Sequence, residues 1–142
     1  MADKKKPVGL TKNTGWQIGL RRTLDRNSQW LWEFLTSSAG LRIWLGPGEP
    51  FPLQEGAVYQ LKDGTTGEVR KVKPGSHWRI TRQPLDPAYD RPTTIQVRVI
   101  PQGKKTTLAF HEEHLPSERQ RQVRKTHYLQ VMEAIKQASG LT

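Results

Sequence analysis

The chain has 142 residues, a formal net charge of +10 and no cysteine. This length suits a single domain with a core of ordinary size, and the lack of cysteine excludes disulfides, thiolate catalysis and cysteine-ligated zinc. No stretch reaches the ~20 apolar residues that a membrane-spanning helix needs, and no apolar segment follows the lysines near the start, which together predict a cytoplasmic protein. The excess of lysine and arginine favours polyanionic partners but says little about the fold.

The first half of the chain predicts a tail, a strand and a broken helix. Residues 1–13 are rich in lysine and lack apolar periodicity, so they are predicted to be a flexible basic tail before a single domain at residues 14–142. Residues 15–24 alternate between apolar and polar side chains, which is typical of a half-buried strand. Residues 27–46 form an aromatic-rich amphipathic pattern that breaks at residues 37–40, and this predicts two short helices whose rings need cover.

The second half of the chain predicts strands followed by one long helix. Alternating patterns predict five strands, at residues 58–61, 67–72, 77–82, 93–100 and 106–115. Asp63 and Gly64 supply the positive backbone angles of a tight hairpin between the first two of these strands. The closing segment is predicted to be a helix that begins after a Ser117 cap and ends near Gly140.

This order of elements predicts an α+β domain. We expect a curved antiparallel sheet to wrap around the long C-terminal helix, because each of them has one apolar face to bury. The two short helices after the first strand are expected to close one end of the sheet. Sheet and helix then enclose a cup with room for a ligand.

Several short motifs occur in an order that resembles a known family. They are Leu31-Trp32-Glu33-Phe34-Leu35-Thr36, Gly40-Leu41, Trp44-Leu45-Gly46-Pro47, Asp63-Gly64, Gly67-Glu68-Val69, Pro74-Gly75, Trp78-Arg79-Ile80, Thr106-Thr107-Leu108 and Phe110-His111. Over about residues 16–139 the chain resembles the heat-shock protein 90 ATPase activator-like branch of the START-like, or SRPBCC, superfamily. It departs from that branch at His127-Tyr128, where a Gly-Trp pair is common, and at Glu112-Glu113-His114, where a small apolar turn is usual.

The resemblance implies a helix-grip fold, in which the sheet grips the C-terminal helix around an apolar cavity. Members of the superfamily mostly bind hydrophobic small molecules, and some act as cyclases or as chaperone-associated domains. The function expected here is therefore a non-catalytic binding module for a hydrophobic or amphipathic small molecule. The alternatives are a chaperone-associated interaction protein and, less favoured, a cyclase or hydrolase using the same cavity, because a fold alone does not choose a function.

The candidate ligand-binding residues lie on the predicted inner face of the sheet and on the closing helix. They are Trp78, Ile80, Ile95, Val97, Phe110, Tyr128 and Met132. Pockets have mostly hydrophobic walls with a few placed polar groups, and the Tyr128 hydroxyl is suited to be one of these. The alternative interpretation is that the same residues simply fill the core, as regularly spaced apolar residues usually do.

Arg22 is the eighth candidate, because the alternation of its strand places it among apolar neighbours. A buried guanidinium needs a partner, such as a ligand carboxylate or phosphate, or the carboxylate of Glu112. The alternative is that a bulge or the end of the strand lets Arg22 reach solvent.

The sequence predicts no catalytic residue, no metal and no cofactor. His111 and His114 are spaced to point to opposite faces of a strand, and the adjacent Glu112 and Glu113 also point apart. The basic residues form the rival interpretation, a phosphate-binding face for nucleic acid made by Arg119, Arg121, Arg124, Lys125, Lys71, Lys73, Lys104 and Lys105. Because no aromatic side chains alternate with these cations, a solvated charged surface is favoured over nucleic-acid binding.

Overall fold

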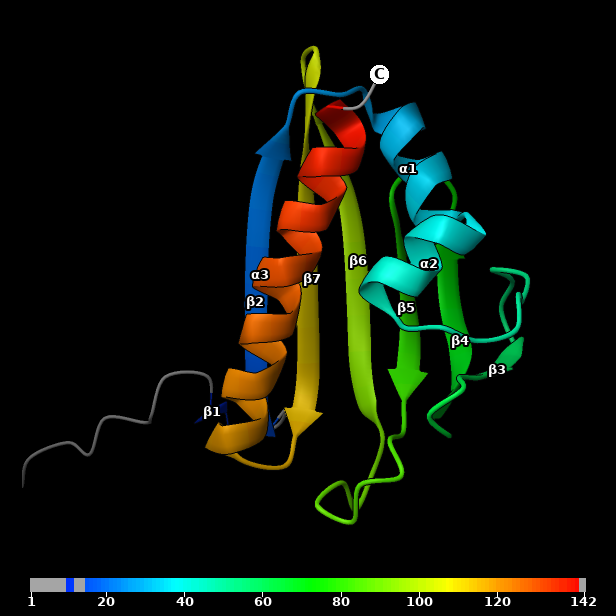
Figure 1. Ribbon diagram of the computed structural model, residues 1–142, viewed down its shortest axis with the longest axis vertical. Helices are drawn as coiled ribbons and strands as arrows, with labels where there is room; N and C mark the ends of the chain where they lie inside the picture. Colours follow the sequence, from blue (N-terminus) through cyan, green and yellow to red (C-terminus); the bar gives the residue numbers. More distant parts are fainter. Residues whose placement is uncertain (1–9, 12–14, 141–142) are drawn as a thin grey trace, which may run out of the picture.

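The computed structural model describes residues 10–11 and 15–140, and Figure 1 shows them as one sheet with three helices on one of its faces. The elements are β1 (Leu10–Thr11), β2 (Gly15–Leu24), α1 (Ser28–Thr36), α2 (Ser38–Trp44), β3 (Val58–Gln60), β4 (Thr66–Lys73), β5 (His77–Arg82), β6 (Thr93–Gln102), β7 (Lys105–Leu115) and α3 (Glu118–Gly140). The strands lie in the order β1-β2-β7-β6-β5-β4-β3, and neighbouring strands are antiparallel. This confirms the predicted α+β helix-grip fold.

The three helices cover different parts of one face of the sheet. The long α3 lies along β2 and β7, and α1 lies over β6 and β7, while α2 packs against α3 (Figure 1). The helix face of the sheet is built by alternation, since Ile95, Val97 and Val99 in β6 are all buried while Arg98 between them is exposed. The apolar core therefore lies between this face and the helices.

Ser37 separates α1 from α2, as the sequence predicted. Its hydroxyl donates to the carbonyl of Phe34 at 2.5 Å and accepts from the backbone N–H of Gly40 at 3.1 Å, so one side chain ends the first helix and begins the second. Gly40 is required at this turn, because a Cβ there would overlap the backbone carbonyl group of Phe34. The break in the helix is thus fixed by two small residues.

The ends of the remaining elements follow the predicted signals. The Ser117 hydroxyl accepts from the backbone N–H of Gln120 at 3.1 Å, which is the expected N-cap of α3. In the turn between β3 and β4, Gly64 has the predicted positive φ, at 90°, but Asp63 does not, and its carboxylate instead accepts from the backbone N–H of Thr65 at 2.9 Å. None of the helices in the described part of the chain is long and apolar enough to cross a membrane.

The predicted boundary of the N-terminal tail needs a correction. Leu10 and Thr11 pair with Trp16 and Gly15 as β1, because Leu10 is apolar and lies opposite the large side chain of Trp16. Residues 1–9 and 12–13 of the predicted tail lie outside the described residues. The division into tail and domain stays a prediction for them.

Candidate functional site

Five aromatic rings form a continuous row through the core, which we call the aromatic row. Trp32 stands edge-on to Trp78 with 4.9 Å between ring centroids, and Trp78 lies 5.6 Å from Trp44. Trp44 is 6.1 Å from Phe110, which stacks on Tyr128 at 5.0 Å. Trp32 is half-buried on α1, whereas the other four rings are buried. The row therefore runs from the surface at α1 to the interior beneath α3.

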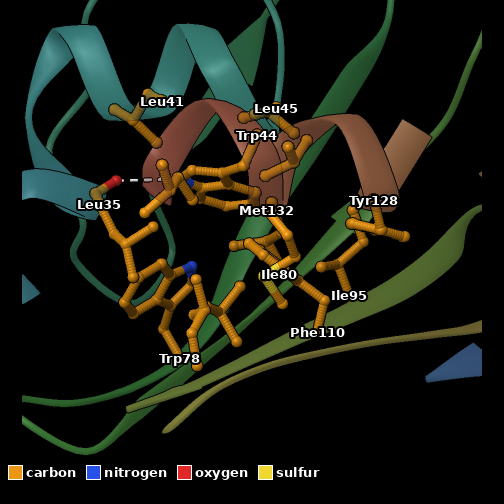
Figure 2. Close-up of a cluster of buried hydrophobic side chains, with 14 of the residues drawn as sticks. Leu35, Leu41, Trp44, Leu45, Trp78, Ile80, Ile95, Phe110, Tyr128 and Met132 are labelled. Atoms are coloured by element: carbon orange, nitrogen blue, oxygen red, sulfur yellow. Dashed lines mark hydrogen bonds between the residues drawn. The ribbon is translucent and has the colours of Figure 1, made fainter. Parts of the chain in front are cut away.

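The structure brings together seven of the eight candidate ligand-binding residues. Trp78 and Ile80 come from β5, Ile95 and Val97 from β6, Phe110 from β7, and Tyr128 and Met132 from α3, and each is at most 3% exposed. Figure 2 shows most of them converging below Trp44 and Leu45. They pack against one another, as a core does, so their role as ligand contacts stays a prediction.

Trp78 differs from its neighbours in having an unpaired polar atom. Its indole Nε1–H is buried without a hydrogen-bond partner, and it is the one such side-chain atom among residues 10–11 and 15–140. The Nε1–H of Trp44, by contrast, donates to the carbonyl of Leu35 at 2.9 Å (Figure 2). Buried donors are nearly always paired, and an unpaired one costs about 1–3 kcal/mol. No protein acceptor in the described part of the chain reaches this N–H.

At the inner end of the aromatic row lies a fully buried carboxylate, Glu112. Its Oε1 accepts from the Nε of Arg124 at 2.7 Å and from the hydroxyl of Tyr128 at 2.7 Å. Its Oε2 accepts from Arg82 at 3.0 Å and from the hydroxyl of Thr93 at 2.6 Å. We call these five residues the Glu112 network. It ties α3 to β5, β6 and β7 and leaves both oxygens of the carboxylate with two donors each.

The electrostatics of the network fix its protonation state. Burial alone would raise the pKa of Glu112, but the charges of Arg124 and Arg82, with the hydrogen bonds from Thr93 and Tyr128, lower it to about 2. Burial, and next the Glu112 charge, raise the pKa of Tyr128. Although Glu112 points inward beside an apolar wall, a carboxylate that stays ionised and is held by four donors is poorly suited to act as a general acid. The network is built to hold the helix to the sheet.

Sequence reasoning missed most of this network. It placed Arg124 on a solvated basic face, but Arg124 is only 6% exposed, and it did not single out Arg82 or Thr93. Two signals were present. Arg124 and Tyr128 are one helical turn apart on the same face, and Glu112 lies on the inward side of its strand, opposite Ile95.

Arg22, the eighth candidate, is exposed, which corrects the expectation that it points into the core. It lies opposite Leu108 on the helix face, as the alternation required, but its side chain stays exposed beside α3. Its side chain donates to the Arg21 carbonyl at 3.0 Å, and it lines a groove of about 260 Å³ with Met132 and other residues of β2 and α3. Alternation tells which side of a sheet a residue takes, and not how closely the covering helix packs on it.

Metal-binding groups do not gather in the part of the chain that the structure describes. It holds no group of three or more histidine, aspartate or glutamate side chains placed to bind an ion. Glu112 and Glu113 point to opposite faces of the sheet, as predicted. Glu112 is buried on the helix face, whereas Oε1 of Glu113 lies 3.4 Å from Nδ1 of His111 on the outer face.

Comparison with protein families gives one match that covers most of the chain. The model of the family described as "Activator of Hsp90 ATPase homolog 1-like protein" matches residues 25–140. The chain belongs to this family. The matched segment includes every residue of the aromatic row and of the Glu112 network. A comparison with curated proteins gives no match.

Solved structures share the fold of this activator-homologue family member at low sequence identity. CV1439 from Chromobacterium violaceum has a TM-score of 0.72 at 17% identity, over 87% of this chain and 96% of that one. The Aha1 dimer from Colwellia psychrerythraea gives 0.67 at 15% identity, over 88% and 96%. PFC0360w, described as an HSP90 activator from Plasmodium falciparum, gives 0.60 at 17% identity, over 72% and 75%. At these identities the likeness shows the fold alone.

The His127-Tyr128 pair, where this member departs from the activator-like pattern, joins two helices. The Nε2 of His127 lies 2.9 Å from the carbonyl of Trp44 and so donates to it, which links α3 to the end of α2. Burial, and after it the charge of Arg124, lower the pKa of His127 from 6.5 to about 4. The imidazole is therefore neutral in the folded protein at neutral pH.

This shift predicts that acid weakens the fold through His127. Between about pH 6.5 and 4 the unfolded chain binds a proton at His127 that the folded chain excludes, so the free energy of unfolding falls as the pH decreases through this window. The full effect is at most roughly 3 kcal/mol. His127→Gln keeps a donor but cannot titrate, and urea unfolding across the window is expected to show a shallower pH dependence than the parent. An unchanged dependence would contradict the assignment to His127.

Proposed function

We propose that this family member is a non-catalytic binding module for a hydrophobic or amphipathic small molecule that carries a hydrogen-bond acceptor. The observation that carries the proposal is the unpaired Nε1–H of Trp78 within the aromatic row. A ligand whose apolar body lies against the rings and whose oxygen accepts from Trp78 would supply the partner that the core lacks. Ile80, Ile95, Val97, Phe110 and Met132 would form the apolar wall around it.

The route to Trp78 leads through α1. Trp32 is half-buried and covers Trp78 edge-on, so moving this one ring opens the row from the surface. Trp30 and Phe34, on the same helix, stack on each other at 5.2 Å and are only partly buried. The aromatic surface of α1 thus offers an apolar approach, while the Glu112 network holds the far end of the site.

Two probes of the same shape test the role of the indole N–H. Acetylnaphthalene has a carbonyl acceptor that ethylnaphthalene lacks, and the parent protein is expected to bind the first about 2–10-fold more tightly, which corresponds to one hydrogen bond of about 0.5–1.5 kcal/mol. Trp78→Phe should abolish this preference. Trp44→Phe is the matched control, because it also replaces an indole by a phenyl ring, and it should keep the preference.

The outcomes of this titration separate the alternatives. If Trp78→Phe keeps the preference for the acceptor, or if neither probe raises the melting temperature of the parent, the ligand-binding proposal is wrong. In that case the aromatic row serves only as core.

A chaperone-associated role is the second candidate. The family description supports it, as does the neighbour from Plasmodium falciparum, which is described as an HSP90 activator. Stimulation of a chaperone ATPase by the purified chain is the measurement that separates this role from ligand binding alone. If saturating amounts of the protein do not stimulate the ATPase, the chaperone-associated role is excluded.

A further inference from the structure

The face of the sheet opposite the helices carries two rows of residues in which half are lysine or arginine. The strand register places the first row side by side across five strands: Arg21, Ala109, Arg98, His77 and Lys73. The second row, two positions along the strands, consists of Gly19, His111, Gln96, Arg79 and Lys71. We call these ten residues the basic strip. It contains five lysines and arginines, two histidines and no acidic residue.

The basic strip faces away from the core. Trp78, between His77 and Arg79, is fully buried, and Arg98 is exposed between the buried Val97 and Val99. All three helices lie on the other side of the sheet (Figure 1). The five lysine and arginine side chains of the strip are exposed. They are therefore accessible to a partner.

Small residues make a hollow in the strip. Gly19 and Ala109 lie between larger neighbours, and a cavity of about 300 Å³ is lined by them together with Arg21, Arg98 and other residues of β2, β6 and β7. Because paired strands lie about 4.8 Å apart, Arg21 and Arg98, on either side of Ala109, are separated by about 10 Å at their Cα atoms. The hollow thus has an arginine on two sides.

The strand register sets positive charges close together in the strip. Lys71 lies directly opposite Arg79, and like charges in such a pair destabilise a sheet. Arg98 lies directly opposite His77 and disfavours a proton there. Burial, followed by the charges of Arg98, Lys71, Lys73 and Arg79, holds the pKa of His77 below its ordinary value. An anionic partner would relieve this repulsion.

We propose that the basic strip binds an acidic segment of another protein, laid across the strands. Arginine pairs with carboxylates through two parallel hydrogen bonds, and the strip offers three arginines on three different strands. Its length of about 19 Å matches roughly six residues of an extended chain. None of the ten residues is a tryptophan, tyrosine or phenylalanine, so the strip lacks the large rings on which nucleic-acid bases stack best. An acidic peptide therefore fits better than a nucleic acid.

The experiment compares two double variants that remove the same charge. Arg79→Gln with Arg98→Gln changes the centre of the strip, while Arg119→Gln with Lys125→Gln changes two exposed residues of α3. The probe is a labelled peptide of about twelve glutamates, measured by fluorescence anisotropy at low salt, where charge pairing is strongest. The strip variant is expected to bind about tenfold more weakly than the parent, and the α3 variant less than about twofold more weakly.

Two further measurements make the result specific. The parent's His77 pKa, followed by NMR, should rise when the peptide binds, and the strip variant should melt no lower than the parent, since it loses repulsive pairs. Equal losses in both variants would mean that only net charge attracts the peptide, and would overturn the proposal. Tighter binding of a thymidine oligonucleotide of equal charge, also lost in the strip variant, would overturn it in favour of nucleic acid.

Discussion

Glu112→Gln is expected to destabilise the protein by about 3–5 kcal/mol, because it leaves the buried guanidinium groups of Arg82 and Arg124 without their counter-charge. Glutamine has nearly the same shape, so the loss reports charge and hydrogen bonding rather than packing. Urea unfolding monitored by circular dichroism measures the change in the free energy of unfolding. A domain of this kind has about 5–15 kcal/mol to lose, so the variant should be close to unfolding.

The neighbouring residue provides the matched control for this substitution. Glu113→Gln removes the same charge one position along β7, on the outer face and partly exposed to solvent, and should cost about 0–1 kcal/mol. A double-mutant cycle with Arg124→Gln should give a coupling energy of about 0.5–3 kcal/mol. Similar losses for the two glutamate variants would show that the Glu112 network does not hold α3 in place.

The direction of the pH effect at Glu112 follows from its lowered pKa. The stabilisation that Glu112 contributes is present above its unfolded pKa of 4.5 and is lost as the pH falls toward about 2. This window lies below that of His127, so the two groups can be separated in one titration. The parent should therefore lose stability in two stages during acidification.

Gly40→Ala is expected to lower the free energy of unfolding by about 3 kcal/mol or more, because the added Cβ would overlap the backbone of Phe34. Overpacking usually costs about 1–3 kcal/mol, and an overlap with backbone atoms falls at the upper end of this range. Backbone atoms cannot move aside as a flexible side chain does, so α1 and α2 must separate. Trp44 donates its Nε1–H to Leu35 across the same turn, and this bond should weaken with them. Thermal unfolding and the near-ultraviolet circular dichroism of the tryptophans measure both effects.

The control for this variant uses a helical glycine with open space around it. A Cβ at Gly140 would have no atom within 4 Å, so Gly140→Ala should be neutral or stabilise the protein by up to about 1 kcal/mol through its higher helix propensity. If both variants behave alike, the tight turn at Gly40 is not the cause.

Much of the fold could be predicted because its signals are local. The strand at residues 77–82 and the first strand at residues 15–24 follow directly from alternation, and their predicted bounds match β5 and β2. The division of residues 27–46 into two helices follows from Ser37 and Gly40, whose preferences act within one turn of the chain. The long C-terminal helix begins just after its predicted cap, Ser117.

The site was predicted less completely, because it depends on how distant elements meet. Seven of the candidates converge as expected. Alternation treats Arg22 as it treats Leu24, yet Arg22 is exposed and Leu24 is buried, because burial depends on how closely α3 packs at each position. The burial of Arg124 requires Glu112 and Arg82, which come from other parts of the chain. The rows of the basic strip likewise depend on the register of five strands, which the sequence of a single strand does not contain.

The shared hydroxyl of Ser37 has a consequence for how the interior is reached. Because the Ser37 hydroxyl caps both the C-terminal end of α1 and the N-terminal end of α2, neither helix can unwind at this joint without breaking a hydrogen bond of the hydroxyl that also serves the other. The two helices should therefore swing as a single rigid flap rather than fray one after the other. A guest that displaces the backbone of α1, rather than only the Trp32 ring, should therefore move α2 as well and strain the His127 contact that holds α2 to α3.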